Sequence, residues 1–245
     1  MLTSFDNLSF LKILSFLKAH GSEFLSGQDM SEVLKISRVA VWKDIKKIRS
    51  LGYKVESKQN IGYRLIDSSK LPLPWEIKEN LNTRFLGNRI YYFNTIDTTQ
   101  NFAMKIASKK NEDGSVVISK KQTGGRGRMK RKWRSPVGGI WMSVIIHPEF
   151  DVTHATLVKK NENMSPLIKQ FLYELEKVLA LINSSQIKKI RNEWTKRSST
   201  IGRNVSIITN EGRVNGKAIK IDNDGGLIIS NGKKTKKVLV GDVKE

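Results

Sequence analysis

The segment from Gln122 to Pro136, QTGGRGRMKRKWRSP, is the feature that most limits how this chain can fold. It combines glycines at 124, 125 and 127 with a run of arginines and lysines, so it cannot bury a core of its own. Residues Ser115–Lys120 before it and Ile140–Ile146 after it have the apolar character of strands. We therefore expect an exposed loop that joins two strands.

The same loop has the chemistry of an anion-binding site. Arg126 and Arg128 bring planar, permanently charged guanidiniums that suit phosphate or carboxylate. The three glycines permit positive φ and a close approach to a ligand, and Trp133 can lie over that ligand. The loop is not a Walker A motif, and Lys130 replaces the last glycine of a dinucleotide fingerprint. A solvated basic surface, or one that touches nucleic acid without specificity, is the alternative.

Composition narrows the class of protein. The 245 residues suffice for one large domain or two to three small ones, with 38% apolar residues for their cores. The 44 Lys and Arg against 23 Asp and Glu give a net charge of +21, which predicts attraction to polyanions such as nucleic acid. Without cysteine there are no disulfides or thiolate zinc sites, and the three histidines stand singly, so we expect no metal site. No membrane span or signal peptide is evident, and we expect a cytoplasmic protein.

The N-terminal segment has the pattern of a winged helix-turn-helix. Phe10, Ile13, Leu14 and Leu17 form one stripe of an amphipathic helix. Ser26 and Ser37 are suited to capping a second and a third helix, and two short strands follow within 53–65. The third helix would enter the major groove. A small helical domain with a solvated basic face is the alternative. The residues expected to contact DNA are Ser37, Arg38, Lys43, Lys46, Lys47, Lys58 and Arg64.

Past a linker at 68–75, residues Arg89–Phe93 have the pattern of a strand. The segment Asp97–Asn101 leads into a helix that ends near Ser108. Thr98 or Thr99 would cap this helix and leave backbone N–H groups free at its start. A plain N-cap explains the same residues without any ligand.

The C-terminal end consists of short β-branched segments at 204–209, 213–221, 227–230 and 235–240. The Asn231-Gly232 pair predicts a type I′ hairpin. Several short strands this close together suggest a small β-barrel.

Three of these motifs resemble the family of bifunctional biotin protein ligases and biotin operon repressors. They are the glycine and arginine loop, the Ser37-Arg-Val-Ala-Val-Trp-Lys helix with Ile61-Gly-Tyr-Arg-Leu, and the terminal Gly241-Asp242-Val243. The resemblance implies an α+β multidomain fold with a mixed sheet in its α/β part. The implied domains are a winged helix at 1–67, the linker at 68–75, a shortened α/β ligase-like domain at 76–198 and an SH3-like barrel at 199–245.

The resemblance also implies an activity: biotin and MgATP give biotinyl-5′-AMP, and biotin then passes to a lysine of a biotin carboxyl carrier protein of acetyl-CoA or pyruvate carboxylase. Operator DNA and a second copy of the chain are further implied partners. The implied biotin contacts are Thr98, Thr99, Gln100, Gln122, Gly125 and Arg126. The implied adenylate contacts are Arg128 and Trp133, and the implied catalytic residues are Arg126 and Arg128.

Two motifs of that family are missing from this chain. Neither Lys-Trp-Pro-Asn-Asp, whose lysine contacts biotin and the α-phosphate, nor Gly-x-Gly-x-Asn occurs anywhere. Residues 151–158 begin a helix that the family continues, and the polar run 159–163 then resembles a junction across a deletion near 158–164. Because joining a carboxylate to ATP depends on placed cations, the loss predicts weakened catalysis. A ligase-dead, biotin-responsive DNA-binding regulator is therefore the alternative.

Overall fold

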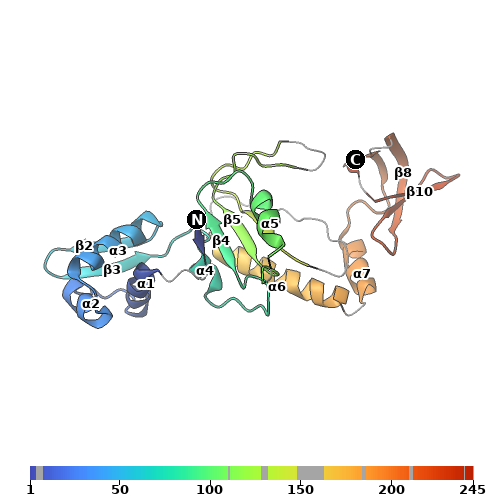
Figure 1. Cartoon of the computed structure of the whole chain (residues 1–245). Coiled ribbons are helices and arrows are strands. Elements are labelled where there is room, and N and C mark those ends of the chain that lie inside the picture. The colour runs from blue at the N-terminus through green and yellow to red at the C-terminus, as the bar shows by residue number, and fades with distance from the viewer. Residues whose placement is uncertain are drawn as a thin grey trace. The chain divides into compact units, whose positions relative to one another are not determined.

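The computed structural model describes residues 1–3, 8–109, 111–127, 132–147, 163–183, 186–209, 212–239 and 241–244. The chain divides into two compact units, Met1–Glu174 and Leu175–Glu245 (Figure 1). Arg128, Lys130 and the segment 151–158 lie outside the described residues.

The first unit begins with three helices, and the sequence pattern accounts for each of them. They are α1 (Ser9–Ala19), α2 (Gly27–Leu34) and α3 (Arg38–Ser50). The α1 stripe predicted from Phe10 to Leu17 is buried. Ser26 caps α2 by accepting from the Gln28 N–H at 3.1 Å, and Ser37 caps α3 by accepting from the Ala40 N–H at 3.1 Å. The helical half of the predicted winged helix is confirmed.

The wing is the antiparallel pair β2 (Lys54–Lys58) and β3 (Gly62–Asp67). Leu25 joins its edge, because the Leu25 and Tyr63 backbones exchange hydrogen bonds of 2.8 and 2.9 Å. Only glycine fits at position 62: φ is 138°, and a Cβ there would lie 2.0 Å from the Leu25 carbonyl oxygen. The close approach of these two backbones fixes where the wing leaves the helices.

The centre of the first unit is a mixed four-stranded sheet in the order β1-β4-β5-β6. Its strands are β1 (Leu2–Thr3), β4 (Ile90–Phe93), β5 (Val116–Ser119) and β6 (Trp141–Val144). The β4 and β5 strands run parallel, while β1 and β6 pair antiparallel at the two ends. The predicted mixed sheet is confirmed. The pairing of β1 with β4 was not foreseen.

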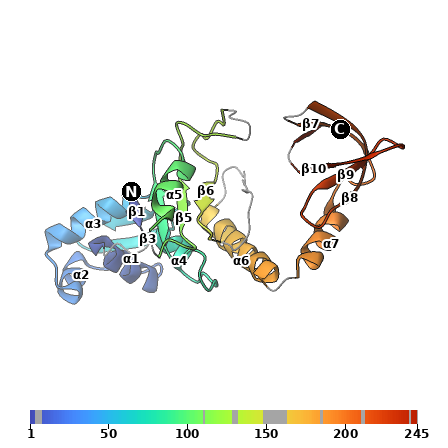
Figure 2. The same cartoon turned by 45° about the vertical axis from the view of Figure 1, so that its right-hand side comes forward.

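Helix α5 (Thr99–Ala107) makes the crossover from β4 to β5, and Figure 2 shows it lying against the sheet. Tyr91 and Val117 from the strands pack with Ala103 and Ile106 from the helix. Since side chains alternate along a strand, Ser119 and Ser143 fall on the same sheet face as Val117. The crossover therefore brings the start of α5 over the polar positions of that face.

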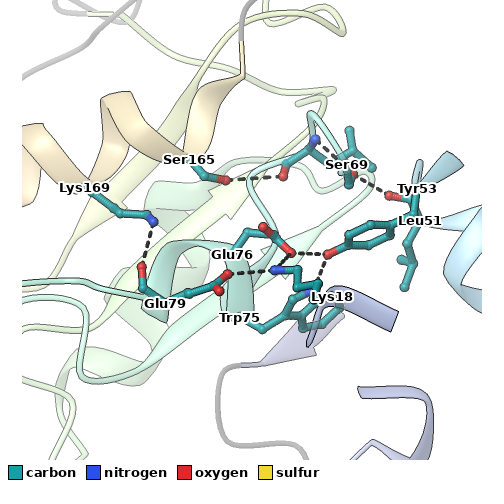
Figure 3. Close-up of polar contacts among 10 residues, drawn as sticks. Lys18, Leu51, Tyr53, Ser69, Trp75, Glu76, Glu79, Ser165 and Lys169 are labelled. Atoms are coloured by element: carbon teal, nitrogen blue, oxygen red, sulfur yellow. Dashed lines mark hydrogen bonds and ion pairs between the residues drawn. The ribbon is translucent and has the colours of Figure 1, made fainter. Parts of the chain in front are cut away.

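A polar network joins the winged helix to helix α4 (Pro74–Lys78), as Figure 3 shows. Lys18 Nζ lies 2.8 Å from Glu76 Oε1 and 2.7 Å from Glu79 Oε2. The Tyr53 hydroxyl donates to Glu76 and accepts from the Trp75 indole N–H at 2.6 Å. Burial lowers the pKa of Lys18, but the bonds to Glu76 and Glu79 outweigh it, so that pKa is raised. Burial and the bond to Glu76 raise the pKa of Tyr53.

Helix α6 (Met164–Asn183) crosses from the first unit into the second, and α7 (Ile187–Arg197) follows it. The α7 helix was not predicted from the sequence. In the first unit, Ile168 and Leu172 of α6 are buried. Lys169 Nζ donates to the Glu79 carbonyl oxygen at 2.7 Å (Figure 3). Along the described ranges, no helix has both the length and the apolarity of a membrane span.

The second unit ends in an antiparallel sheet in the order β10-β9-β8-β7-β11. Its strands are β7 (Asn204–Thr209), β8 (Gly212–Ile221), β9 (Leu227–Ser230), β10 (Thr235–Val238) and β11 (Asp242–Lys244). Val205, Ile207, Ala218, Ile229 and Val238 form its core. Over the residues described in this unit, β10 and β11 are the edges of an open sheet.

The prediction of a type I′ hairpin at Asn231-Gly232 is wrong. Ser230 pairs with Thr235, so four residues form the loop. Gly232 has φ of 90°, but Asn231 is not among the residues with positive φ, whereas a type I′ turn requires both. Asn231 Oδ1 instead accepts from the N–H groups of Lys233 and Lys234, at 3.1 and 2.9 Å. These local side-chain bonds stabilise a longer turn.

Candidate functional site

The start of α5 is held by its capping residue, which is Thr98 and not Thr99. Thr98 Oγ1 accepts from the Asn101 N–H at 2.8 Å. Asp97 Oδ2 accepts from Asn101 Nδ2 at 2.6 Å. That bond, together with the bond from the Thr98 backbone, lowers the pKa of Asp97. The Thr98 hydroxyl oxygen thus serves as the N-cap, and the half-buried Gln100 is the second residue of α5.

Thr99 and Gln122 meet at the centre of the site. Gln122 Oε1 accepts from the Thr99 backbone N–H at 2.7 Å and lies 3.2 Å from Thr99 Oγ1. Gln122 Nε2 donates to Ser135 Oγ at 2.9 Å, and Thr99 Oγ1 lies 2.9 Å from Ser143 Oγ. We call Thr99, Gln122, Ser135 and Ser143 the polar cluster. It links the α5 N-terminus to both ends of the basic loop and to β6.

Two hydrogen-bonding groups, one in the polar cluster and one near it, have no partner among the described residues. The Gln122 amide carries two N–H bonds, of which Ser135 takes one and no other described residue takes the second. Ser119 Oγ is buried without a hydrogen-bond partner among the described residues, on the strand face that carries Ser143. Since buried polar groups are normally hydrogen-bonded, these two groups suit a polar ligand.

Ser119, Ser135 and Ser143 were missed in the sequence. A hydroxyl residue inside an apolar strand is a usable signal, and Ser143 within Ile140–Ile146 has it. Ser135 had no such signal, because its role depends on the return of the loop.

The described ends of the basic loop pair with each other. The backbones of Arg126 and Lys132 form an isolated antiparallel β-bridge. Next to it, the Trp133 N–H donates to the Gly125 carbonyl oxygen at 2.8 Å. The Gly124 N–H donates to the Asp97 carbonyl oxygen at 2.9 Å, which ties the loop to the residues before α5. Arg126 and Trp133 are exposed. Arg126 also lies close enough to contribute to the lowered pKa of Asp97.

Glycine is needed at 125 for a reason other than the one predicted. Neither Gly124 nor Gly125 has positive φ, so that expectation is wrong for these two residues. A Cβ at 125 would lie 2.5 Å from the Trp133 carbonyl oxygen and 2.7 Å from Ser135 Oγ. A Cβ at 124 would have its nearest neighbour at 3.6 Å. The close contact at Gly125 comes from the returning strand of the same loop.

The site therefore has two chemically different parts. The polar cluster offers neutral donors and acceptors at a helix N-terminus, which suit an uncharged polar head group. Beside it, Arg126 offers a guanidinium for an anion. A cavity of about 340 Å³ beside Lys120 and Gly138–Gly139 includes none of these residues among its described lining. Within the described ranges, no three acidic or histidine side chains come together to hold a metal ion.

The expected DNA-contacting residues lie on two elements of the winged helix. Arg38, Lys43, Lys46 and Lys47 are exposed on α3. On the wing, Lys58 is exposed at the end of β2.

Three of the expected DNA contacts have partners within the protein. Lys46 Nζ lies 3.6 Å from the centre of the Trp42 ring. The Ser37 hydroxyl caps α3. Arg64 Nε lies 2.7 Å from Glu56 Oε2, and its guanidinium lies 4.6 Å from the centre of the Phe24 ring. Most of the exposed cations among the expected contacts thus lie on α3.

The chain thus combines a winged helix, a mixed α/β domain with a polar and cationic site, and a C-terminal β-sheet. Comparison with protein families supports each part in the same order. An HTH domain matches residues 11–64, the biotin/lipoate A/B protein ligase family matches residues 92–200, and the biotin protein ligase C terminal domain matches residues 200–244. Each of these models matches less than half of the chain, and together they make it similar, part by part, to biotin protein ligases.

Similar proteins carry the corresponding descriptions. The bifunctional ligase/repressor BirA of Bacillus subtilis is 40% identical over 138 residues, which are 56% of this chain and 42% of the relative. The protein of that name from Escherichia coli is 34% identical over 134 residues, 54% of this chain and 39% of the relative. This chain thus matches about two fifths of the length of these relatives.

A solved structure supports the fold. A variant of the biotin protein ligase from Aquifex aeolicus, in complex with biotin, superposes with a TM-score of 0.52 at 16% identity. The superposition covers 63% of this chain and 97% of that one.

Proposed function

We propose that this protein is a biotin–[biotin carboxyl carrier protein] ligase that also binds operator DNA as a repressor. The observation that carries the proposal is the bridge made by Gln122, whose amide joins Thr99 at the start of α5 to Ser135 at the return of the loop. It puts neutral hydrogen-bonding groups for a ureido head group beside a cationic loop for a carboxylate and a phosphate.

The proposed biotin contacts are Thr98, Thr99, Gln100, Gln122, Gly125 and Arg126. The second N–H of the Gln122 amide and the Ser119 hydroxyl support this proposal, because neither has a hydrogen-bond partner among the described residues. The proposed adenylate contacts are Trp133, which is exposed on the returning strand of the loop, and Arg128, which rests on the family resemblance.

In the first proposed step, a biotin carboxylate oxygen attacks the α-phosphorus of ATP and pyrophosphate leaves, giving biotinyl-5′-AMP. Mg²⁺ enters with ATP as part of the substrate. Arg126 and Arg128 would offset the negative charge that accumulates as the two anions approach. In the second step, the amine of a carrier-protein lysine attacks the acyl carbon, and AMP leaves with the bonding electrons.

The missing Lys-Trp-Pro-Asn-Asp motif bears on the rate of the first step. By analogy with deletion of one transition-state donor, loss of its lysine would cost a factor of roughly 10²–10³. We therefore expect adenylation to be slow, while the protein still selects biotin and ATP as its substrates. A DNA-binding regulator that binds biotin or its adenylate without catalysis is the second candidate, and the absent lysine motif is what favours it.

The test is to incubate the full chain with MgATP, biotin and a biotin carboxyl carrier domain, and to detect the biotinylated carrier by mass spectrometry. The ligase proposal expects label that requires both MgATP and the acceptor lysine, with a Lys→Arg carrier as the control. Label no greater than in a carrier-only reaction would remove the ligase and leave the regulator.

The remaining parts of the proposal concern partners and architecture. A homodimer would match the two halves of a palindromic operator, and sedimentation with and without biotinyl-5′-AMP would detect it. Because operator DNA and MgATP are cytoplasmic, the proposal places the protein in the cytoplasm. We also propose that the C-terminal sheet has the curvature of an SH3-like barrel, which the match to the biotin protein ligase C terminal domain supports.

A further inference from the structure

Helix α3 exposes two large apolar side chains on an otherwise cationic surface. Val39 is 61% exposed and Trp42 is 47% exposed, whereas three other apolar residues of the same helix are buried. Those buried positions are Val41, Ile45 and Ile48 on the opposite face. Val39 and Trp42 are three residues apart, so they neighbour each other on the helix surface and form an apolar spot there.

The surroundings of this spot indicate a polyanionic partner. Arg38 and Lys43 lie next to Val39 and Trp42 in the sequence, and the Lys46 Nζ lies 3.6 Å from the centre of the Trp42 ring. Asp44, the one acidic residue of α3, accepts from Ser9 Oγ of α1 at 3.3 Å. The exposed face of α3 therefore carries its apolar side chains in the N-terminal half, with cationic side chains beside them and along the rest of the helix.

We propose that Val39 and Trp42 read thymine in the major groove by contacting its C5-methyl group. This inference rests on the proposed DNA binding and goes further by naming the base and the residues that recognise it. The N-terminal residues of a recognition helix reach the base edges, and both side chains lie in the first five residues of α3. The thymine methyl is the apolar group that bases present in that groove. Lys43, Lys46 and Lys47 then meet the phosphates on either side.

The test uses the full chain with biotin and MgATP present. Duplexes are first enriched from a randomised pool, and each dT of the enriched site is then replaced singly by dU, which removes only the methyl group. We expect at least one dU substitution to weaken binding roughly fourfold, as expected for the loss of one buried methyl. Val39→Ala or Trp42→Ala should abolish the sensitivity to that substitution.

The control variant is Val33→Ala. Val33 lies on α2 and is 60% exposed, almost the same as Val39. Val33→Ala therefore removes the same atoms as Val39→Ala, but from a different helix. It should bind like the unchanged protein and keep the dU sensitivity. Far-ultraviolet circular dichroism checks that each variant folds. If Trp42→Ala does not fold, Val39→Ala carries the test.

The outcomes separate this inference from the function it rests on. No enrichment of any duplex would remove the DNA-binding proposal itself. Enrichment with equal binding of dT and dU duplexes would overturn the methyl reading and leave DNA binding in place. The reading would also be overturned if Val39→Ala and Trp42→Ala changed the sedimentation of the protein but not its dU sensitivity. That result would make the spot a protein interface.

Discussion

Gly125 offers the sharpest perturbation of the proposed ligand site. Adding one methyl there places a Cβ 2.5 Å from the Trp133 carbonyl oxygen, which is about 1 Å short of a normal contact. The neighbouring Gly124 provides a matched control, because a Cβ there would lie 3.6 Å from its nearest neighbour. Neither glycine has positive φ, so backbone strain does not separate the two variants.

Overpacking of this kind typically costs about 1–3 kcal/mol. If the paired loop ends are needed to hold biotinyl-5′-AMP, that cost corresponds to about 5- to 150-fold weaker binding by Gly125→Ala. Gly124→Ala, which has room for its methyl, should stay within about 0.5 kcal/mol of the unchanged protein. The difference between the two variants, not either value alone, measures the contribution of the close contact.

Calorimetric titration of each protein with biotinyl-5′-AMP provides the affinities, and thermal unfolding without ligand checks the folded state. The reasoning predicts a selective loss of affinity in Gly125→Ala. Equal affinities for the two variants would show that the contact with Trp133 does not support binding. Equal losses in both would point to a general effect of glycine replacement.

Three further predictions concern other parts of the chain. Arg126→Ala should weaken biotinyl-5′-AMP binding by about 1.5–3 kcal/mol through loss of a charge-assisted hydrogen bond, and unchanged calorimetric affinity would contradict its role. Arg38→Ala should lower affinity for the enriched DNA and reduce the slope of affinity against salt by about one ion; an unaltered gel shift would argue against docking of α3. Lys18→Met should lower the free energy of unfolding at pH 7 by about 1–2 kcal/mol, since it leaves Glu76 without its cation. The pKa of Lys18 is raised in the folded state, so its contribution is complete below about pH 10.5 and is lost as the pH rises through the folded value. Denaturant unfolding should therefore show the gap between Lys18→Met and the unchanged protein closing at high pH.

Much of the fold could be predicted because local signals agreed with the tertiary packing. The Phe10–Leu17 stripe and the caps at Ser26 and Ser37 each predict a helix boundary within a few residues. Strands β4, β5 and β6 were legible as apolar runs. In α1, β4 and β5, most of the side chains that define the pattern are the ones that the core buries.

The missed elements had no such agreement. Strand β1 consists of Leu2–Thr3, too short for a period of two to appear, and exists because β4 offers it an edge. Helix α7 is rich in lysine and arginine, and its apolar residues are limited to Ile187, Ile190 and Trp194. The hairpin at Asn231 was wrong because its side-chain bonds to the next lysines favour a longer turn.

Only some residues of the candidate site could be predicted from the sequence. Thr99 and Gln122 stood out through family resemblance, and the structure brings them within hydrogen-bonding distance. Ser135 could not be found, because its position depends on the return of the loop, whereas Ser119 and Ser143 each place a hydroxyl inside a predicted strand. Sequence separation hid contacts that the sheet creates.

Amide hydrogen exchange at the two described ends of the basic loop, residues 122–127 and 132–136, tests the central claim most directly. With biotinyl-5′-AMP in excess, the account predicts slower exchange at these amides than in the free protein, and no slowing for Arg126→Ala at the same ligand concentration. Unchanged exchange at the loop ends in the unsubstituted protein, at any ligand concentration reached, would contradict the claim that this loop and the polar cluster hold the activated vitamin.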